Sequence, residues 1–123
     1  MSKLYKLDII TRPSMLDDFA AALHAAGVKG MTVNQVFGCG VQKGHQEVYR
    51  GKTYNISLVQ KVKIEIVIGE KYLDRVLELA QEFLHTGEAG DGKIFIFELH
   101  DAVRIRTGER GIHAILESEI EAD

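Results

Sequence analysis

The sequence has few of the features that mark secreted or membrane proteins. It contains one cysteine among 123 residues, so it cannot build a disulfide framework. No stretch approaches the roughly 18 consecutive apolar residues of a membrane span. The N-terminus, MSKLYKLDII, lacks the long apolar run that follows the basic segment of a secretory signal. Together these absences predict a cytoplasmic protein.

The chain also lacks a strong charge of one sign. Its formal net charge is -3, and four acidic residues lie at the C-terminus, at Glu117, Glu119, Glu121 and Asp123. Residues 1–116 therefore carry a net charge of +1, which argues against a broad face for binding polyanions. With 46% hydrophobic residues, we expect one compact domain over residues 1–116 and a disordered acidic tail at 117–123.

Hydrophobic periodicity predicts two successive strand–helix–strand units. The first consists of a strand over Lys3–Thr11, a helix that begins at a Ser14/Asp17 capping box and ends at Gly27, and a strand over Met31–Phe37. The second consists of a strand over Val62–Ile68, a helix over Lys71–His85 ended by Thr86 and Gly87, and a strand over Lys93–Leu99. Val103–Arg106 is a candidate for a short fifth strand.

Right-handed crossovers in both units place the two helices on one face of a four-stranded antiparallel-and-parallel sheet, which is the ferredoxin-like arrangement. The opposite face has no helix in this chain. The last strand nevertheless carries apolar residues on both of its faces, with Ile94 and Ile96 alternating with Phe95 and Phe97. Copies of the chain would bury such a face well, so we predict a symmetric oligomer.

The segment Gly38–Lys61 has no lasting period of 2 or 3.6. About 20 residues without such a pattern are uncommon inside a compact domain, and they are usually disordered or functional. Tyr49, Arg50 and Tyr54 supply groups typical of a docking surface, whereas disordered tracts are poor in aromatic residues. We interpret the segment as a docking loop, with a solvated hairpin as the alternative.

A second chemical signal is TGEAGDGKIF at Thr86–Phe95. It matches the start of a phosphate-binding loop, but Ile94 replaces the Ser or Thr that would hold Mg²⁺. The order helix, loop, strand is the reverse of a true P-loop, which excludes a P-loop NTPase. We interpret the segment instead as a turn whose backbone N–H groups bind an anion beside Lys93. The alternative is a flexible turn between helix and strand.

Two arginines strengthen the case for a phosphate ligand. Arg104 and Arg106 alternate with Val103 and Ile105, so we expect both arginines to project from one face while the apolar pair packs. Paired guanidinium groups suit a polyphosphate, and with Lys93 they favour a bound nucleotide over a solvated strand edge.

Three motifs in order resemble those of the PII signal-transduction family, the GlnB and GlnK nitrogen and energy sensors. They are GCGVQKGHQEVYRGKTY, TGEAGDGKIF and RIRTGERG, and the similarity extends to about residue 114. The resemblance implies an α+β, ferredoxin-like double βαβ subunit that assembles as a homotrimer, with a T-loop at about 37–57 and a B-loop at about 86–93. It further implies a regulator rather than an enzyme, with ATP or ADP in each cleft between subunits. The T-loop would dock on a membrane transporter, a metabolic enzyme or a transcription regulator.

Carried over by motif, the resemblance implies nucleotide contacts from Gly30, Met31, Thr32, Gly38, Gly40, Gln42, Gly90, Gly92, Lys93, Arg104 and Arg106. In family members that bind 2-oxoglutarate with Mg-ATP, the glutamine at Gln42 helps to hold Mg²⁺ and the ligand, and the lysine at Lys61 pairs with a ligand carboxylate. Tyr49, Arg50 and Tyr54 are the implied docking residues. Arg50 matches the arginine that enters an ammonium channel, so any association with a membrane is expected only through a transporter partner.

The sequence also departs from the family pattern. Val41 stands where an arginine near the phosphates is often found, and Lys52 and Thr53 differ from the pair expected around a uridylylated tyrosine at Tyr54. The GCGVQ form and acidic tail resemble Gram-positive variants, some of which sense adenylates alone. An adenylate-only energy sensor that does not bind 2-oxoglutarate is therefore the alternative.

Two other classes are disfavoured by the residues themselves. No Ser-His-Asp or Cys-His spacing supports an enzyme. The segment Lys93–Phe97 lacks the glycines interleaved with exposed aromatic residues that an RNA-recognition strand requires.

Overall fold

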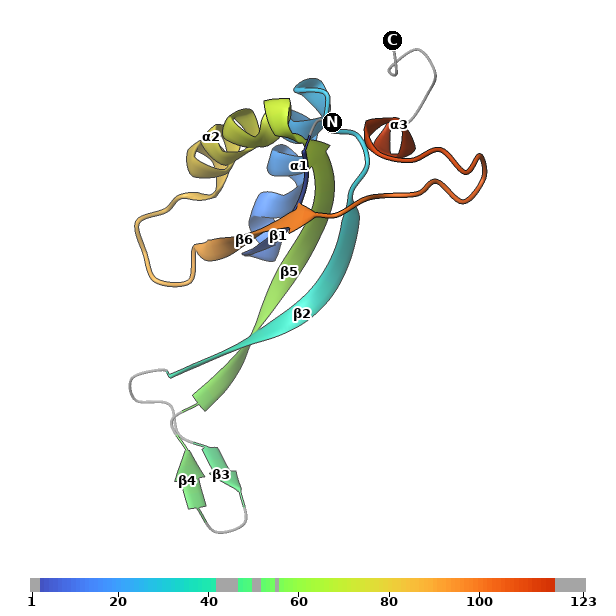
Figure 1. The fold of residues 1–123 in the computed structure, drawn as a ribbon. Coiled ribbons are helices and arrows are strands. Elements are labelled where there is room, and N and C mark those ends of the chain that lie inside the picture. Colours follow the sequence, from blue (N-terminus) through green and yellow to red (C-terminus); the bar gives the residue numbers. More distant parts are fainter. Residues whose placement is uncertain (1–2, 42–46, 50–51, 55, 117–123) are drawn as a thin grey trace.

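The computed structural model describes residues 3–41, 47–49, 52–54 and 56–116 (Figure 1). Its elements, in chain order, are β1 (Leu4–Thr11), the 3-10 helix η1 (Pro13–Met15), α1 (Leu16–Ala25), β2 (Thr32–Val41), β3 (Glu47–Tyr49), β4 (Lys52–Tyr54), β5 (Ile56–Gly69), the 3-10 helix η2 (Glu70–Tyr72), α2 (Leu73–Leu84), β6 (Gly92–Leu99) and α3 (Ile112–Ile115).

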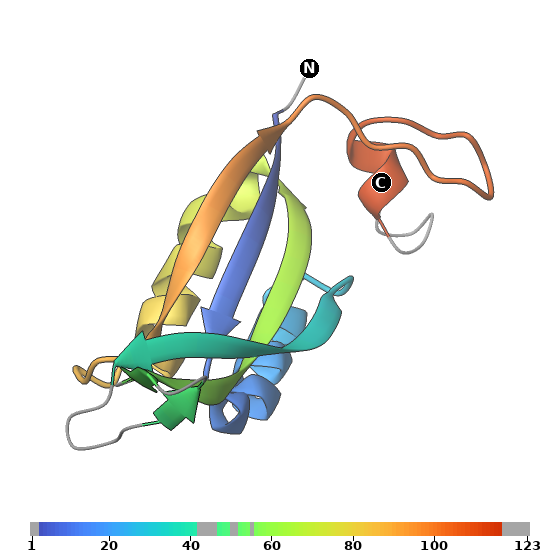
Figure 2. The same cartoon turned by 90° about the horizontal axis from the view of Figure 1, so that it is seen from below.

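The main sheet has the strand order β2-β5-β1-β6, and each neighbouring pair is antiparallel. β5 lies between β1 and β2, so the two strands of the first βαβ unit are not neighbours. The ferredoxin-like arrangement is therefore confirmed, but the expected parallel pairing within this sheet is wrong. Helices α1 and α2 lie together on one face of the sheet, as Figures 1 and 2 show.

The core lies between these two helices and the sheet. Alternate residues of β1 and β5 face the helices, because successive side chains of a strand point to opposite faces. The buried apolar side chains of the core are Leu7, Ile9, Phe19, Leu23, Val28, Val62, Ile64, Ile66, Ile68, Val76, Leu79, Ala80 and Leu84. Full burial of one large apolar side chain is worth about 1.5–3 kcal/mol, so this cluster is the main force that holds helices to sheet.

The start of the first helix differs from the expectation. Pro13 opens the 3-10 helix η1, and α1 begins only at Leu16, with no side-chain cap from its N-cap residue. The predicted Ser14/Asp17 capping box is wrong because Ser14 lies inside the 3-10 helix. The predicted stop at Gly27 is confirmed: Gly27 has φ +99°, and the N–H of Val28 donates to the Leu23 carbonyl at 2.9 Å.

Strands β2 and β5 extend well beyond the predicted ends at Phe37 and Val62. They stay paired from Thr32↔Glu65 to Val41↔Ile56 and form a two-stranded ribbon. The short β3–β4 hairpin lies beyond the end of this ribbon that is farther from the helices (Figure 1). Phe37 and Leu58 on this ribbon are 68% and 69% exposed. Because no helix of the described residues covers the ribbon, neither of its faces has to be apolar, and the hydrophobic pattern of the sequence there shows no period.

The segment after β6 forms no fifth strand. Val103 makes an isolated bridge with Arg110, and a turn follows it. Val103 and Ile105 are 58% and 99% exposed, so the expectation that they pack while both arginines project is wrong. The chain leaves the sheet at His100 and turns back on itself before α3, a short helix that the periodicity did not predict. Among the described residues, no helix has the length and apolar content to cross a membrane.

The sheet face opposite the helices is uncovered by the described residues. Phe95 and Phe97 are each 48% exposed there, beside a charged group in which Lys63 pairs with Asp8 at 3.7 Å and with Glu65 at 3.3 Å. The hydrogen bond to Glu65 is the largest cause that raises the pKa of Lys63. These ion pairs neutralise the charges within one chain, which leaves the face suited to burial against another protein surface.

Candidate nucleotide-binding site

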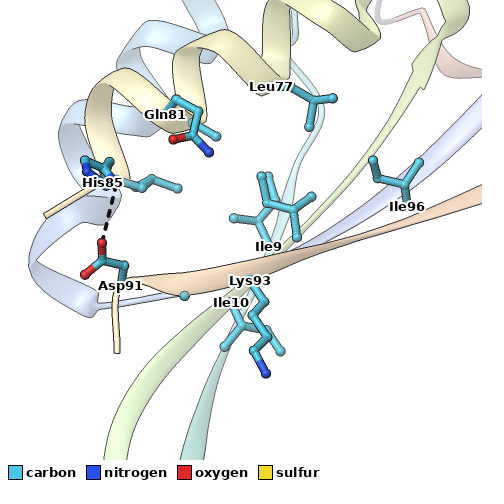
Figure 3. A pocket seen from close by; sticks show the side chains of 12 residues that line it. Ile9, Ile10, Leu77, Gln81, His85, Asp91, Lys93 and Ile96 are labelled. Carbon is cyan, nitrogen blue, oxygen red and sulfur yellow. Dashed lines mark ion pairs between the residues drawn. The ribbon is translucent and has the colours of Figure 1, made fainter. Parts of the chain in front are cut away.

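The glycine-rich segment between α2 and β6 is folded around one carboxylate. Asp91 accepts hydrogen bonds from the backbone N–H groups of Thr86 at 2.7 Å and Gly87 at 2.9 Å, and also from the Thr86 hydroxyl. The Thr86 hydroxyl is the largest cause that lowers the pKa of Asp91 to about 2. His85 Nδ1 lies 3.8 Å from the same carboxylate (Figure 3). An ionised Asp91 therefore closes the base of this loop.

Two cations hold the other side of the loop. Arg12 donates from Nη1 to the Thr86 hydroxyl at 3.3 Å and from Nη2 to the Ala89 carbonyl at 3.1 Å. Lys61 Nζ donates to the Gly90 carbonyl at 2.6 Å. Arg12 was not predicted as a site residue, since it belongs to none of the three motifs and meets the loop only through the fold. Both cations add positive charge beside the turn, as an anion site requires.

Gly90 and Gly92 of the loop are required to be glycine for two different structural reasons. Gly90 has φ +97°, a conformation that side-chain-bearing residues rarely adopt. Gly92 has φ +126°, and a Cβ at this position would lie 2.0 Å from the Ile10 carbonyl oxygen. The backbone of β6 can therefore approach β1 at this point only without a side chain.

A cleft of about 640 Å³ lies beside the loop. Its walls bring together Gly38, Lys61, Gly90, Gly92 and Lys93, all of which were predicted site residues, and add Ile10 and Phe95. Sites for small ligands have volumes of about 300–1,000 Å³, so the cleft is large enough for part or all of a nucleotide.

A second groove, of about 400 Å³, continues from this cleft between α2 and β6. Figure 3 shows Leu77 and Gln81 of α2, and His85 directly after it, on one side of the groove, with Ile9 and Ile96 of the sheet on the other. The groove shares Asp91, Gly92 and Lys93 with the cleft, among other residues, so the loop borders both hollows.

The predicted arginines do not meet this cleft within one chain. β6 pairs with β1 from Gly92↔Thr11 at the loop end to Leu99↔Leu4 at the other end. Arg104 and Arg106 follow the far end, and eight strand residues span about 25 Å. Arg104 is instead paired with Glu109 at 3.7 Å. The single chain thus separates the cationic groups that the sequence suggested would act together.

The other predicted residues fall into three groups. Gly30, Met31 and Thr32 lie at or just before the start of β2, and Gly30 lines a small pocket with Ile112 and Ile115. Gly40 lies on the β2–β5 ribbon, and Tyr49 and Tyr54 lie on the β3–β4 hairpin. Gln42 and Arg50 lie outside the described residues.

The fold and the cleft define a small ferredoxin-like subunit with a glycine-rich loop that Arg12 and Lys61 hold from neighbouring elements. The family model described as "Nitrogen regulatory protein P-II" matches residues 4–109, and the chain belongs to this family. Proteins of the family are trimeric signal-transduction regulators rather than enzymes.

Individual relatives agree with this assignment over most of their lengths. A nitrogen regulatory protein P-II of Azospirillum brasilense is 47% identical over 110 residues, which cover 89% of this chain and 98% of the relative. Nitrogen regulatory protein GlnK of Escherichia coli (strain K12) is 46% identical over 101 residues, covering 82% and 90%.

Solved structures are similar as well. B. subtilis GlnK superposes with a TM-score of 0.77 at 42% identity, covering 92% of this chain and 99% of that one. A B. subtilis GlnK–ATP complex superposes with a TM-score of 0.78 at 38% identity, covering 93% and 98%. Arabidopsis thaliana PII bound to citrate superposes with a TM-score of 0.75 at 36% identity, covering 96% and 94%.

Proposed function

We propose that this nitrogen regulatory protein binds ATP or ADP in clefts between the subunits of its trimer and signals through its T-loop. The observation that carries the proposal is the separation of two cationic groups along β6. Lys93 and the glycine-rich loop lie at one end, whereas Arg104 and Arg106 follow the other end about 25 Å away. Only a second copy can bring its arginines to the first copy's cleft.

Two further findings support this arrangement. The open sheet face exposes Phe95 and Phe97 beside charges that are paired within the chain, and copies of the chain would bury these two rings. A similar protein, B. subtilis GlnK, forms a complex with ATP. Gly30, Met31 and Thr32 would then line the adenine side, while Gly38, Gly40, Gly90 and Gly92 would present backbone to the phosphates.

The second ligand we propose is 2-oxoglutarate, bound only together with Mg-ATP through Gln42 and Lys61. In the present structure Lys61 Nζ is engaged by the Gly90 carbonyl at 2.6 Å, so a carboxylate ligand has to compete for this ammonium group. The alternative is a sensor of adenylates alone, which the valine at Val41 favours. Titration of 2-oxoglutarate with and without Mg-ATP separates the two, since only the first hypothesis predicts binding that Lys61→Ala abolishes.

The output we propose is docking of the T-loop, with Tyr49, Arg50 and Tyr54, onto a cytoplasmic partner. Candidate partners are a membrane transporter, a metabolic enzyme and a transcription regulator, and the transporter would bring the protein to the membrane. ATP and ADP would favour different loop states through different contacts at Gln42. A pull-down with ATP or ADP present identifies the partner, and equal capture with both nucleotides would contradict the switch.

The cleft itself is tested by calorimetry of ATP and ADP binding. If each cation makes one charge-assisted hydrogen bond, Lys93→Ala and Arg104→Ala should each cost about 1.5–3 kcal/mol of ATP affinity. Arg75→Ala is the matched control, because Arg75 is an exposed arginine of α2 that pairs with Glu78 and lines neither the cleft nor the groove.

Mixed trimers test whether the site lies between subunits. In a ring in which each cleft takes Lys93 from one copy and Arg104 from the next, some clefts of a co-refolded mixture of the two variants contain neither substitution. We therefore expect part of the wild-type ATP affinity to return on mixing. A mixture in which no high-affinity sites return, although each variant alone binds weakly, would place the site within one chain.

A further inference from the structure

One carboxylate, that of Asp101, organises the loop that carries Arg104 and Arg106. Its Oδ1 accepts hydrogen bonds from the backbone N–H groups of Ala102 at 2.8 Å and Gly111 at 3.0 Å. Its Oδ2 accepts from Arg110 Nε at 2.7 Å and also contacts Arg110 Nη2. The Ala102 N–H is the largest cause that lowers the pKa of Asp101, so the group remains charged at neutral pH. Asp101 thus joins the two ends of the loop.

The rest of the loop is held by backbone hydrogen bonds and not by apolar packing. Its backbone closes through Arg104 N–H to the Glu109 carbonyl at 2.9 Å, Gly108 N–H to the Arg104 carbonyl at 2.7 Å and Gly111 N–H to the Ala102 carbonyl at 3.0 Å. Its two apolar residues, Val103 and Ile105, are exposed rather than packed. Without an apolar core, the position of the loop depends on the polar bonds at its base.

The base of the loop also sets the register of the arginines. Pairing of Val103 with Arg110 brings the neighbouring Glu109 opposite Arg104, where Glu109 Oε1 lies 3.7 Å from Arg104 Nη1. The Arg104 side chain is only 19% exposed. The direction of this guanidinium group therefore follows from how Asp101 and Arg110 close the base.

We infer that Asp101, with Arg110, is a positioning residue for nucleotide binding: it places Arg104 and Arg106 for the phosphates in a neighbouring subunit's cleft and does not touch the nucleotide itself. This inference rests on the proposed function, in which those arginines bind ATP. It adds a determinant outside the residues implied by the motifs.

The direction in which ATP affinity changes when Asp101 is removed distinguishes a positioning role of this residue from an effect of its charge alone. Asp101 is an anion beside a cationic loop, so its removal makes the loop more positive and, by Coulomb attraction alone, should tighten binding of ATP. Loss of positioning predicts the opposite. We expect Asp101→Ala to weaken ATP binding about tenfold or more, the effect of one lost hydrogen bond to a charged group.

The experiment is calorimetry of ATP binding to the full chain and its variants. Arg110→Lys keeps the positive charge but loses the paired contacts with Asp101 Oδ2, so it should also weaken binding, and it serves if Asp101→Ala does not fold. Glu98→Ala is the matched control, since it removes the same charge from the nearby end of β6, and within the described part of the chain no hydrogen bond or ion pair joins Glu98 to the loop. Light scattering checks that each variant keeps the wild-type oligomeric state.

A double-mutant cycle completes the test. In a chain that already carries Arg104→Ala and Arg106→Ala, adding Asp101→Ala should change ATP affinity no further, because residues of one network are not additive. The inference is overturned if Asp101→Ala and Arg110→Lys bind ATP as Glu98→Ala does, if they bind more tightly, or if the loss persists in the background that lacks Arg104 and Arg106. Wild-type ATP affinity in the arginine variants themselves would instead refute the proposed function, and this inference with it.

Discussion

The close approach of β6 to β1 at Gly92 leads to a sharp prediction about stability. In Gly92→Ala the new Cβ would lie 2.0 Å from the Ile10 carbonyl oxygen and 3.0 Å from the carbonyl carbon. These are backbone atoms of β1, which is paired on both sides with β5 and β6 and cannot easily move away. A positive φ costs about 1–2 kcal/mol and overpacking costs about 1–3 kcal/mol. We therefore expect the free energy of unfolding to fall by about 2–5 kcal/mol.

Two other glycines separate these contributions. Gly108 has φ +75° with no atom within 4 Å of a built Cβ, so Gly108→Ala should show only the backbone cost of about 1–2 kcal/mol. Gly30 has neither a positive φ nor a near neighbour, and Gly30→Ala should change stability by less than about 0.5 kcal/mol. Urea unfolding without nucleotide, at one protein concentration because oligomers unfold in a concentration-dependent way, measures all three. A loss in Gly92→Ala no larger than that in Gly108→Ala would refute the steric argument.

Three further changes test the core, the loop and the open face. Phe19→Ala removes a fully buried ring and should lower the free energy of unfolding by about 3–5 kcal/mol in the same urea assay, and a loss below about 1 kcal/mol would contradict the assigned core. Asp91 has a pKa lowered from 3.8 to about 2, so its contribution to holding the loop is complete above about pH 4 and is lost as the pH falls toward 2. The protection of the Thr86 and Gly87 amides, taken relative to their intrinsic exchange rates, should fall over that window, but not in Asp91→Asn, which lacks the titrating group. Phe95→Asp places a charge on the open face and should yield smaller species in light scattering, whereas a change on the helix side, Lys71→Asp, should not; intact trimers in Phe95→Asp would contradict the assigned interface.

Much of the fold follows from local pattern. The alternation over Val62–Ile68 and the apolar stripes of the two helices predicted the faces that the structure buries, because the spacing of apolar residues must match the period of the element that buries them. Gly27 stops its helix as expected. The pattern failed where no single face is buried, as in the β2–β5 ribbon, and where Pro13 made a 3-10 helix in place of a capped helix start.

The sequence by itself determined which segments form the main strands and helices and where the glycine-rich loop lies, since strand alternation, helical stripes and the glycine-rich motif are local properties. Only the tertiary structure decided which distant groups meet. Arg12 reaches a loop more than 70 residues away, and Gly92 must be small because of a carbonyl on another strand. Likewise, Lys93 and Arg104 look close in sequence, yet β6 is extended and holds them at opposite ends of the sheet. Their separation depends on the path of the backbone, which no local period encodes.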